Sequence, residues 1–205
     1  HTIDVLTALK EAKVYPEWVQ VGNEINPGML LPKGSMTDHP EALVSYLNAG
    51  YDSTKEVFPD TKVITHLAGI CYSKWCEAFY DKFFELGGKT DILGLSHYPY
   101  WLNYGTETEI PALYLMKYAE RYGKPVMICE VGGEAKKEDE TYELLVNSIR
   151  AVKMILLEKA AQQGGVAGAG HRAGQGVFLL RRGVLANHAR GQGVQLRVGE
   201  RRTGR

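Results

Sequence analysis

The spacing of apolar residues changes repeatedly between two patterns along residues 1–159, and this alternation limits the possible folds more than any other sequence feature. Stretches with the spacing of an amphipathic helix alternate with short, nearly continuous apolar runs, which are typical of strands buried on both faces. Four consecutive strand–helix units predict a parallel sheet covered by helices, either open and doubly wound or closed as a barrel. The expected strands are residues 18–24, 62–68, 91–98 and 125–132, and the expected helices are residues 2–13, 40–57, 73–86, 111–122 and 139–159.

Two observations favour a closed barrel over an open sheet. No G-x-G-x-x-G or G-x-x-x-x-G-K-[ST] motif opens any expected helix, so the nucleotide site that is typical of open sheets lacks support. In addition, polar residues gather where the strands end, namely Asn23 and Glu24, His66, Ser96 to Tyr98, and Glu130. This edge carries the chemistry in a (β/α)8 TIM barrel, which is therefore the predicted fold.

The helix expected at residues 73–86 carries regularly spaced aromatic residues. Trp75, Phe79 and Phe83 recur every fourth position, and this spacing places side chains on one face of a helix. We therefore expect all three aromatic rings to be buried against the sheet.

Charge divides the chain near Ala160. Residues 1–159 hold 16 basic residues against 23 acidic ones, a net charge of −7, whereas residues 160–205 hold eight Arg, no Lys and one acidic residue, a net charge of +7. We expect a partial catalytic barrel over residues 1–159 and an atypical Gly/Arg-rich tail over residues 160–205, in which residues 174–180 could be a remnant of an eighth strand. The tail is either the product of a change in coding frame or a basic segment that binds acidic glycans or nucleic acid.

Composition also bounds the partners and the cofactors. The zero net charge of the whole chain gives no support for a nucleic-acid or membrane partner, and no run reaches the about 18 to 20 apolar residues of a membrane span. Three cysteines, Cys71, Cys76 and Cys129, are too few for a disulfide framework. Cys71 and Cys76 could pair, or both could be reduced thiols. No metal-ligand spacing and no G-x-S-x-G elbow is present, so neither a metal nor a cofactor is expected.

Glu24 and Glu130 each end an apolar strand, where a carboxylate costs free energy unless it is paired or hydrogen-bonded. Two such residues three strands apart would face each other across a barrel mouth. Retaining glycoside hydrolysis needs two carboxyl groups roughly 5 to 5.5 Å apart, one as acid/base and one as nucleophile. Alternatively, each Glu is an ordinary edge residue paired with a Lys or Arg.

An aromatic cluster follows the third expected strand, and it favours a carbohydrate cleft. It comprises Tyr98, Tyr100, Trp101 and Tyr104, whose rings could stack on the apolar faces of sugars. The alternative is a packed loop. His66 could likewise contact substrate from the same edge, or could be a histidine of the core.

At these residues the sequence resembles glycoside hydrolase family 53, the arabinogalactan endo-β-1,4-galactanases. The run WVQVGNEINPGMLLPKG at 18–34 is similar to the fourth-strand motif of that family, and NAGYDSTKEVFPDTKVITHLA at 48–68 and DILGLSHYPYW at 91–101 follow in the expected order. PVMICEVG at 125–132 fits the seventh strand. The resemblance covers roughly residues 2–150 and implies a polysaccharide substrate, β-1,4-galactan.

The resemblance also implies roles for individual residues. Glu24 would be the acid/base, Glu130 the nucleophile, and Asn23 a hydrogen-bond partner of the 2-hydroxyl of the sugar. Tyr98 would orient the nucleophile.

The remaining implied contacts are those of His66 and Trp101, which would help to shape the galactan subsites. Members of the family act on plant cell-wall polymers, so the resemblance implies a secreted or periplasmic location. Oligomeric state cannot be read from the sequence.

Three departures from the family pattern concern the site and the ends of the chain. Leu31 stands where the family often carries Trp, VGGEAKK after Glu130 lacks the expected aromatic residues, and no Trp follows Trp101. Only 17 residues precede Trp18, so we expect strands four to seven of the barrel and part of an eighth. The alternatives are an inactive fragment with at most glycan binding, or a related hydrolase that acts on mannan or β-glucan.

Overall fold

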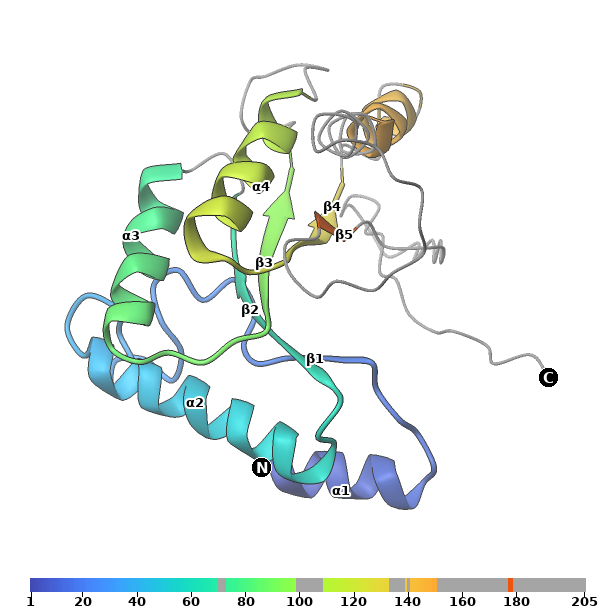
Figure 1. The fold of residues 1–205 in the computed structure, drawn as a ribbon. Helices are drawn as coiled ribbons and strands as arrows, with labels where there is room; N and C mark the ends of the chain where they lie inside the picture. Colours follow the sequence, from blue (N-terminus) through green and yellow to red (C-terminus); the bar gives the residue numbers. More distant parts are fainter. Residues whose placement is uncertain (70–72, 99–108, 133–138, 140, 151–176, 179–205) are drawn as a thin grey trace. The chain divides into compact units, whose positions relative to one another are not determined.

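The computed structural model describes residues 1–69, 73–98, 109–132, 139, 141–150 and 177–178. The elements follow one another in the order α1 (Thr2–Glu11), β1 (Trp18–Gln20), α2 (Pro40–Val57), β2 (Lys62–Leu67), α3 (Ser73–Glu85), β3 (Ile92–His97), α4 (Glu109–Tyr122), β4 (Val126–Val131) and β5 (Val177–Phe178) (Figure 1). Residues 139 and 141–150 are also helical. The predicted alternation of helix and strand is confirmed in this part of the chain.

The strands form one sheet in the order β1-β2-β3-β4-β5, so each described strand lies beside the next one in the sequence. β1 and β2 are parallel, with Trp18 opposite Lys62, and β4 and β5 are parallel, with Val126 opposite Val177. Parallel neighbours joined by helices are the βα units that the periodicity predicts. The pairing of β5 with β4 also confirms a strand within residues 174–180.

The chain divides into two compact units, and the boundary falls within β3. The first unit comprises residues 1–68 and 72–94, and it contains α1, β1, α2, β2 and α3. In this unit α1 packs against α2, and α2 also contacts α3 and β2 (Figure 1). The second unit comprises residues 69–71 and 95–205, and in it α4 contacts β4 and β5.

Helix α2 approaches the segment that follows β1 very closely. Pro40 begins the helix, where its missing N–H is not needed, and Leu43 and Leu47 are buried along its inner face. At Gly50, an added Cβ would lie only 2.6 Å from a methyl group of Val21. Glycine is therefore required here because the helix backbone itself packs on the Val21 side chain.

Helix α3 buries two of the three aromatic residues assigned to its inner face. Phe79 and Phe83 are buried, as predicted, whereas Trp75 is 54% exposed. The buried face also includes Cys76 and Tyr80, and Trp75 lies roughly a quarter turn away from the centre of that face. The prediction for Trp75 was wrong because the buried face is centred between the row of Phe79 and Phe83 and the row of Cys76 and Tyr80.

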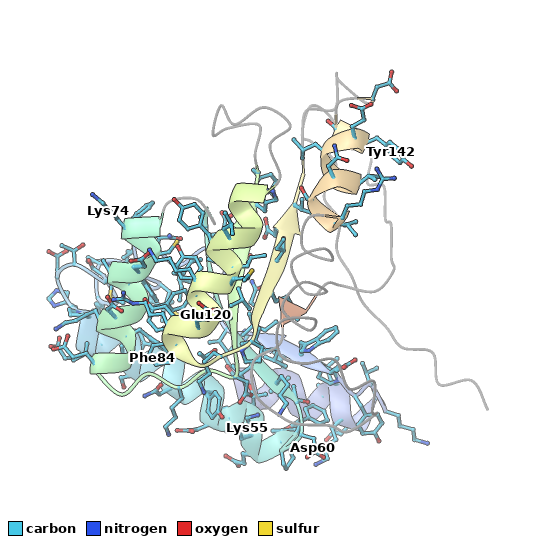
Figure 2. The ribbon with its side chains drawn as sticks, turned by 45° about the horizontal axis from the view of Figure 1, so that its top comes forward. Lys55, Asp60, Lys74, Phe84, Glu120 and Tyr142 are labelled. Atoms are coloured by element: carbon cyan, nitrogen blue, oxygen red, sulfur yellow. The ribbon has the colours of Figure 1, made fainter. Side chains whose placement is uncertain are left out.

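The Asp91 carboxylate joins α2, β2 and the start of β3 within the first unit. Its Oδ2 accepts hydrogen bonds from Lys55 Nζ at 2.6 Å and from the Val63 backbone N–H at 2.9 Å, and its Oδ1 accepts one from the Tyr51 hydroxyl at 3.2 Å. Lys55, which lies on α2 (Figure 2), also donates to the Thr61 carbonyl at 2.7 Å. Burial by itself would raise the pKa of Asp91, but the bonds from Lys55 and Val63 and the charge of Lys55 lower that pKa below its ordinary 3.8.

No helix in the described ranges is both long enough and apolar enough to cross a membrane.

We predict that Asp91→Asn lowers the free energy of unfolding by about 2 kcal/mol, because it removes one partner of a largely buried ion pair. Since the pKa of Asp91 is lowered from 3.8 in the folded protein, the contribution is present above pH about 4 and is lost as the pH falls further. Urea titrations at pH 7 and pH 3 measure both effects.

The matched control is Asp52→Asn, which breaks the exposed Asp52–Lys89 pair at 2.8 Å. An exposed pair contributes about 0 to 1 kcal/mol, so this variant should unfold almost like the unmodified protein. Equal losses in the two variants would contradict the role given to Asp91.

Candidate active site

Asn23 and Glu24 lie in a turn that follows β1, not at the end of a strand. The strand expected at 18–24 ends at Gln20, because Gly22 has φ +81° and Glu24 has φ +47°, and left-handed residues cannot continue an extended chain. The turn is nevertheless fastened to β2, since the Ile25 N–H donates to the His66 carbonyl at 3.0 Å. Glu24 therefore lies at the carboxyl end of β1, as the barrel interpretation requires.

The side chains of the turn are accessible to a ligand. Asn23 is exposed, and its Oδ1 accepts a hydrogen bond from Gln20 Nε2 at 3.0 Å. The same Gln20 nitrogen donates to the Gly22 carbonyl at 3.0 Å. Glu24 is half-buried. One glutamine side chain thus orients the Asn23 amide and braces the turn that carries Glu24.

His66 is fully buried within β2. His66 lies beside the turn of Glu24, at the sheet edge where the sequence analysis placed it. Its complete burial agrees with the alternative that it is a histidine of the core. Substrate contact by His66 stays a prediction.

Residues 27–36, which follow the turn, fold back on themselves as a short hairpin. Gly28 and Ser35 form an antiparallel bridge, and the Met29 N–H donates to the Gly34 carbonyl at 3.0 Å. A Cβ at Gly28 would collide with the Gly34 carbonyl oxygen, and one at Gly34 would collide with the Met29 carbonyl oxygen. The tip of this hairpin exposes Leu30 and Leu31, which are 68% and 58% exposed.

In the second unit, the side chains of Tyr98 and Glu130 form a hydrogen-bonded pair. The Tyr98 hydroxyl donates to Glu130 Oε2 at 2.8 Å, and both side chains are half-buried. Tyr98 follows the last residue of β3, and Glu130 is the next-to-last residue of β4. A hydrogen bond to a carboxylate fixes which oxygen points toward the phenol, and it therefore holds the other oxygen in a defined direction.

His97 is a buried residue beside Tyr98, to which the sequence analysis gave a place at the strand end but no role. Its Nε2 lies 3.3 Å from Ser148 Oγ, whose own hydrogen is donated to the Leu144 carbonyl at 2.8 Å. Because Ser148 has used its hydrogen, it accepts from His97, and this fixes the tautomer with hydrogen on Nε2. Burial lowers the pKa of His97 from 6.5 to about 4, so the imidazole is neutral at neutral pH.

Cys129 is next to Glu130 but does not supply a reactive thiolate. The pKa of its thiol is raised to about 12, mainly by burial and to a smaller extent by the charge of Glu130, with a backbone hydrogen bond involving Leu95 acting in the opposite direction. Thiolates are the nucleophilic form of cysteine. Glu130 is therefore the better candidate nucleophile on β4.

Several sequence predictions concern residues outside the described ranges. Trp101, Tyr100, Tyr104 and Cys71 lie there, so their contacts stay predictions. Cys76 is buried, and its sulfur lies 3.5 Å from the Ala68 carbonyl oxygen. Within the described ranges, no group of three or more His, Cys, Asp or Glu side chains could hold a metal ion.

Comparison with known proteins gives the same assignment along most of the chain. The family model of glycosyl hydrolase family 53 matches residues 1–166. An "Uncharacterized protein in bgaB 5'region" of Niallia circulans is 40% identical over 139 residues, which are 63% of this chain and 37% of the relative. The "Arabinogalactan endo-beta-1,4-galactanase" of Cellvibrio japonicus is 28% identical over 202 residues, which are 95% of this chain and 49% of the relative.

A solved structure confirms the fold. The "Ignisphaera aggregans GH53 catalytic domain" superposes with a TM-score of 0.60 at 28% identity, over 72% of this chain and 42% of that one. The chain therefore carries part of a (β/α)8 barrel, as predicted from the polar residues at the strand ends and the absence of nucleotide-binding motifs. It spans less than half the length of the curated relatives described above.

We predict that the folded protein loses stability as the pH falls from about 6.5 to about 4. In this window the unfolded chain binds a proton at His97 and the folded chain does not, so each step down in pH favours unfolding. The full effect is at most about 3 kcal/mol. Urea titrations at several pH values measure it.

The control for the range between pH 6.5 and pH 4 is His97→Gln, because a glutamine side chain does not titrate. Its free energy of unfolding is expected to be lower at pH 7 but to change less between pH 7 and pH 4.5. Parallel pH curves for the two proteins would show that His97 is not the titrating group.

Proposed function

Because the chain belongs to glycosyl hydrolase family 53, we propose that the protein is a retaining endo-β-1,4-galactanase that cleaves galactan or arabinogalactan. The observation that carries the proposal is the hydrogen bond from Tyr98 to Glu130 at the ends of the neighbouring strands β3 and β4. It gives one carboxylate the fixed orientation that a nucleophile needs. The similarity to the arabinogalactan endo-β-1,4-galactanase of Cellvibrio japonicus supports the choice of substrate.

In the first proposed step, Glu130 attacks the anomeric carbon of the sugar while Glu24 protonates the departing glycosidic oxygen. The glycosidic bond breaks, and a covalent ester joins the sugar to Glu130. In the second step, Glu24 removes a proton from water, and the resulting oxygen displaces Glu130 from the anomeric carbon. The product keeps the configuration of the substrate, and both carboxyl groups return to their initial protonation states.

The surroundings of Glu130 support its role as the nucleophile. Tyr98 donates to one carboxylate oxygen and leaves the other for attack, while the adjacent Cys129 is a protonated thiol at neutral pH. No competing anion is therefore supplied by the neighbouring residue. Tyr98 is proposed to orient the nucleophile through this bond.

Three further residues are proposed to contact the polysaccharide. Asn23 is exposed beside Glu24 and would donate to the 2-hydroxyl of the sugar, a bond that strengthens in the transition state. His66 and Trp101 would help to shape the subsites.

The cellular location and the chain organisation follow from the same assignment. A polymer of the plant cell wall is too large to enter a cell, so the proposed location is secreted or periplasmic. We also propose that residues 1–159 carry the catalytic part and that residues 160–205 are an atypical tail, of which β5 pairs with β4.

We predict that the full chain releases reducing sugar from β-1,4-galactan and that Glu130→Gln reduces this release to background. The amide cannot form the covalent ester, so only the uncatalysed rate is left. A reducing-sugar assay on galactan, mannan and β-glucan measures both activity and selectivity. Glu120→Gln, a change of an exposed carboxyl on α4 (Figure 2), is the control and should leave the rate unchanged.

Each alternative outcome of this assay has a definite meaning. Activity that survives Glu130→Gln would contradict the assignment of the nucleophile. Hydrolysis of mannan or β-glucan without hydrolysis of galactan would contradict the substrate. Absence of hydrolysis on all three, with the chain folded, would favour the inactive fragment, and affinity electrophoresis in galactan gels would then show whether the chain binds glycan.

We predict that Tyr98→Phe lowers kcat on galactan by about tenfold or more, because a hydrogen bond to a charged group contributes about 1.5 to 3 kcal/mol. The control is Tyr142→Phe, since Tyr142 is 70% exposed and points away from its helix (Figure 2). Initial rates at saturating galactan give kcat for both variants. Equal rates for the two would remove Tyr98 from the mechanism.

A further inference from the structure

Asn26 is a buried polar residue, two positions after Glu24, to which the proposed mechanism gives no role. It is only 4% exposed. Its Nδ2 donates to the Ala68 carbonyl at 3.2 Å, and its Oδ1 accepts from the Ala68 N–H at 2.6 Å. The side-chain amide thus bonds to both main-chain groups of Ala68, in the way that a neighbouring strand would.

These two bonds continue a ladder that fastens the turn to β2. The Val21 N–H donates to the Ile64 carbonyl at 3.2 Å, and the Ile25 N–H donates to the His66 carbonyl at 3.0 Å. Asn26 adds the next contact in this direction, at Ala68, the residue that follows β2. Glu24 therefore lies between anchored residues on both sides.

The backbone of Glu24 needs such anchoring. Its φ of +47° is uncommon for a residue with a side chain. A strained conformation of this kind persists only when the surrounding structure holds it in place. The bonds of Ile25 and Asn26 to β2 supply that restraint on the carboxyl side of Glu24.

We infer that Asn26 is a positioning residue for the acid/base, because its amide fastens the turn that aims the Glu24 carboxyl group. The inference rests on the proposed role of Glu24. General acid catalysis requires that carboxyl group to lie within hydrogen-bond reach of the departing oxygen. Since a displacement of about 1 Å can reduce the rate about 10²-fold, loosening the turn should act on kcat.

The chain offers a matched control for the loss of such an amide. Asn48 also makes one donor and one acceptor bond to the main chain elsewhere in the first unit, because its Nδ2 donates to the Gly87 carbonyl at 3.0 Å and its Oδ1 accepts from the Lys89 N–H at 2.8 Å. Asn48→Ala therefore removes an equivalent side chain without touching the turn. The test compares Asn26→Ala and Asn48→Ala in the full chain by galactan kinetics and by amide hydrogen exchange.

For Asn26→Ala we expect kcat to fall about 10-fold to 100-fold with KM changed less than threefold. The amide hydrogens of Ile25 and Ala68 should exchange at least tenfold faster. For Asn48→Ala we expect unchanged kcat and unchanged exchange at Ile25, with faster exchange at Lys89. Asn26→Asp, which keeps the acceptor for the Ala68 N–H, should give intermediate values and serves as the readout if Asn26→Ala does not fold.

The inference is overturned if Asn26→Ala keeps both the wild-type kcat and the wild-type protection of the Ile25 amide. It is equally overturned if the Asn48→Ala variant loses kcat to the same extent. If the unmodified chain releases no sugar from galactan, the proposed function fails. Exchange at Ile25 then decides by itself whether Asn26 holds the turn.

Discussion

The Asp91 carboxylate is the constraint on which the first unit depends. It receives hydrogen bonds from α2 through Lys55 and from the start of β2 through Val63, and it stands immediately before β3. A charge with partners on two elements sets the spacing between them more strictly than apolar contacts do, because an unpaired carboxylate in this largely buried place would be costly. The network holds the amino ends of β2 and β3 in place. The polar side chains of the candidate site lie at the opposite, carboxyl ends of the strands.

The two candidate catalytic carboxyl groups are held in different ways. Glu24 depends on its own backbone, which lies in a left-handed turn bonded to β2, whereas Glu130 extends from a regular strand and is oriented by the Tyr98 hydroxyl. A group that must gain and lose a proton and a group that must attack from one direction need different surroundings. In the structure, the orientation of Glu24 is set by its backbone in one unit, and that of Glu130 is set by a neighbouring side chain in the other.

The sequence was most informative where burial alone decides the structure. β2, β3 and β4 lie where continuous apolar runs predicted them, to within one residue at each end. The predicted strand at 18–24 was too long, because the residue pattern does not reveal the positive φ of Glu24. The bond between His97 and Ser148 joins residues 51 positions apart. Such a pairing depends on the tertiary fold, so the local spacing of residues in the sequence does not predict it.

The base and the tip of the hairpin at residues 27–36 differ in how well they accommodate substitutions. Gly28 and Gly34 meet carbonyl oxygens where any side chain would collide, so selection against substitution should be strong at the base. Leu30 and Leu31 at the tip face solvent, and new side chains there would leave the turn of Glu24 undisturbed. A changed surface beside the turn of Glu24 is therefore expected to be accepted at the tip of the hairpin and rejected at its base.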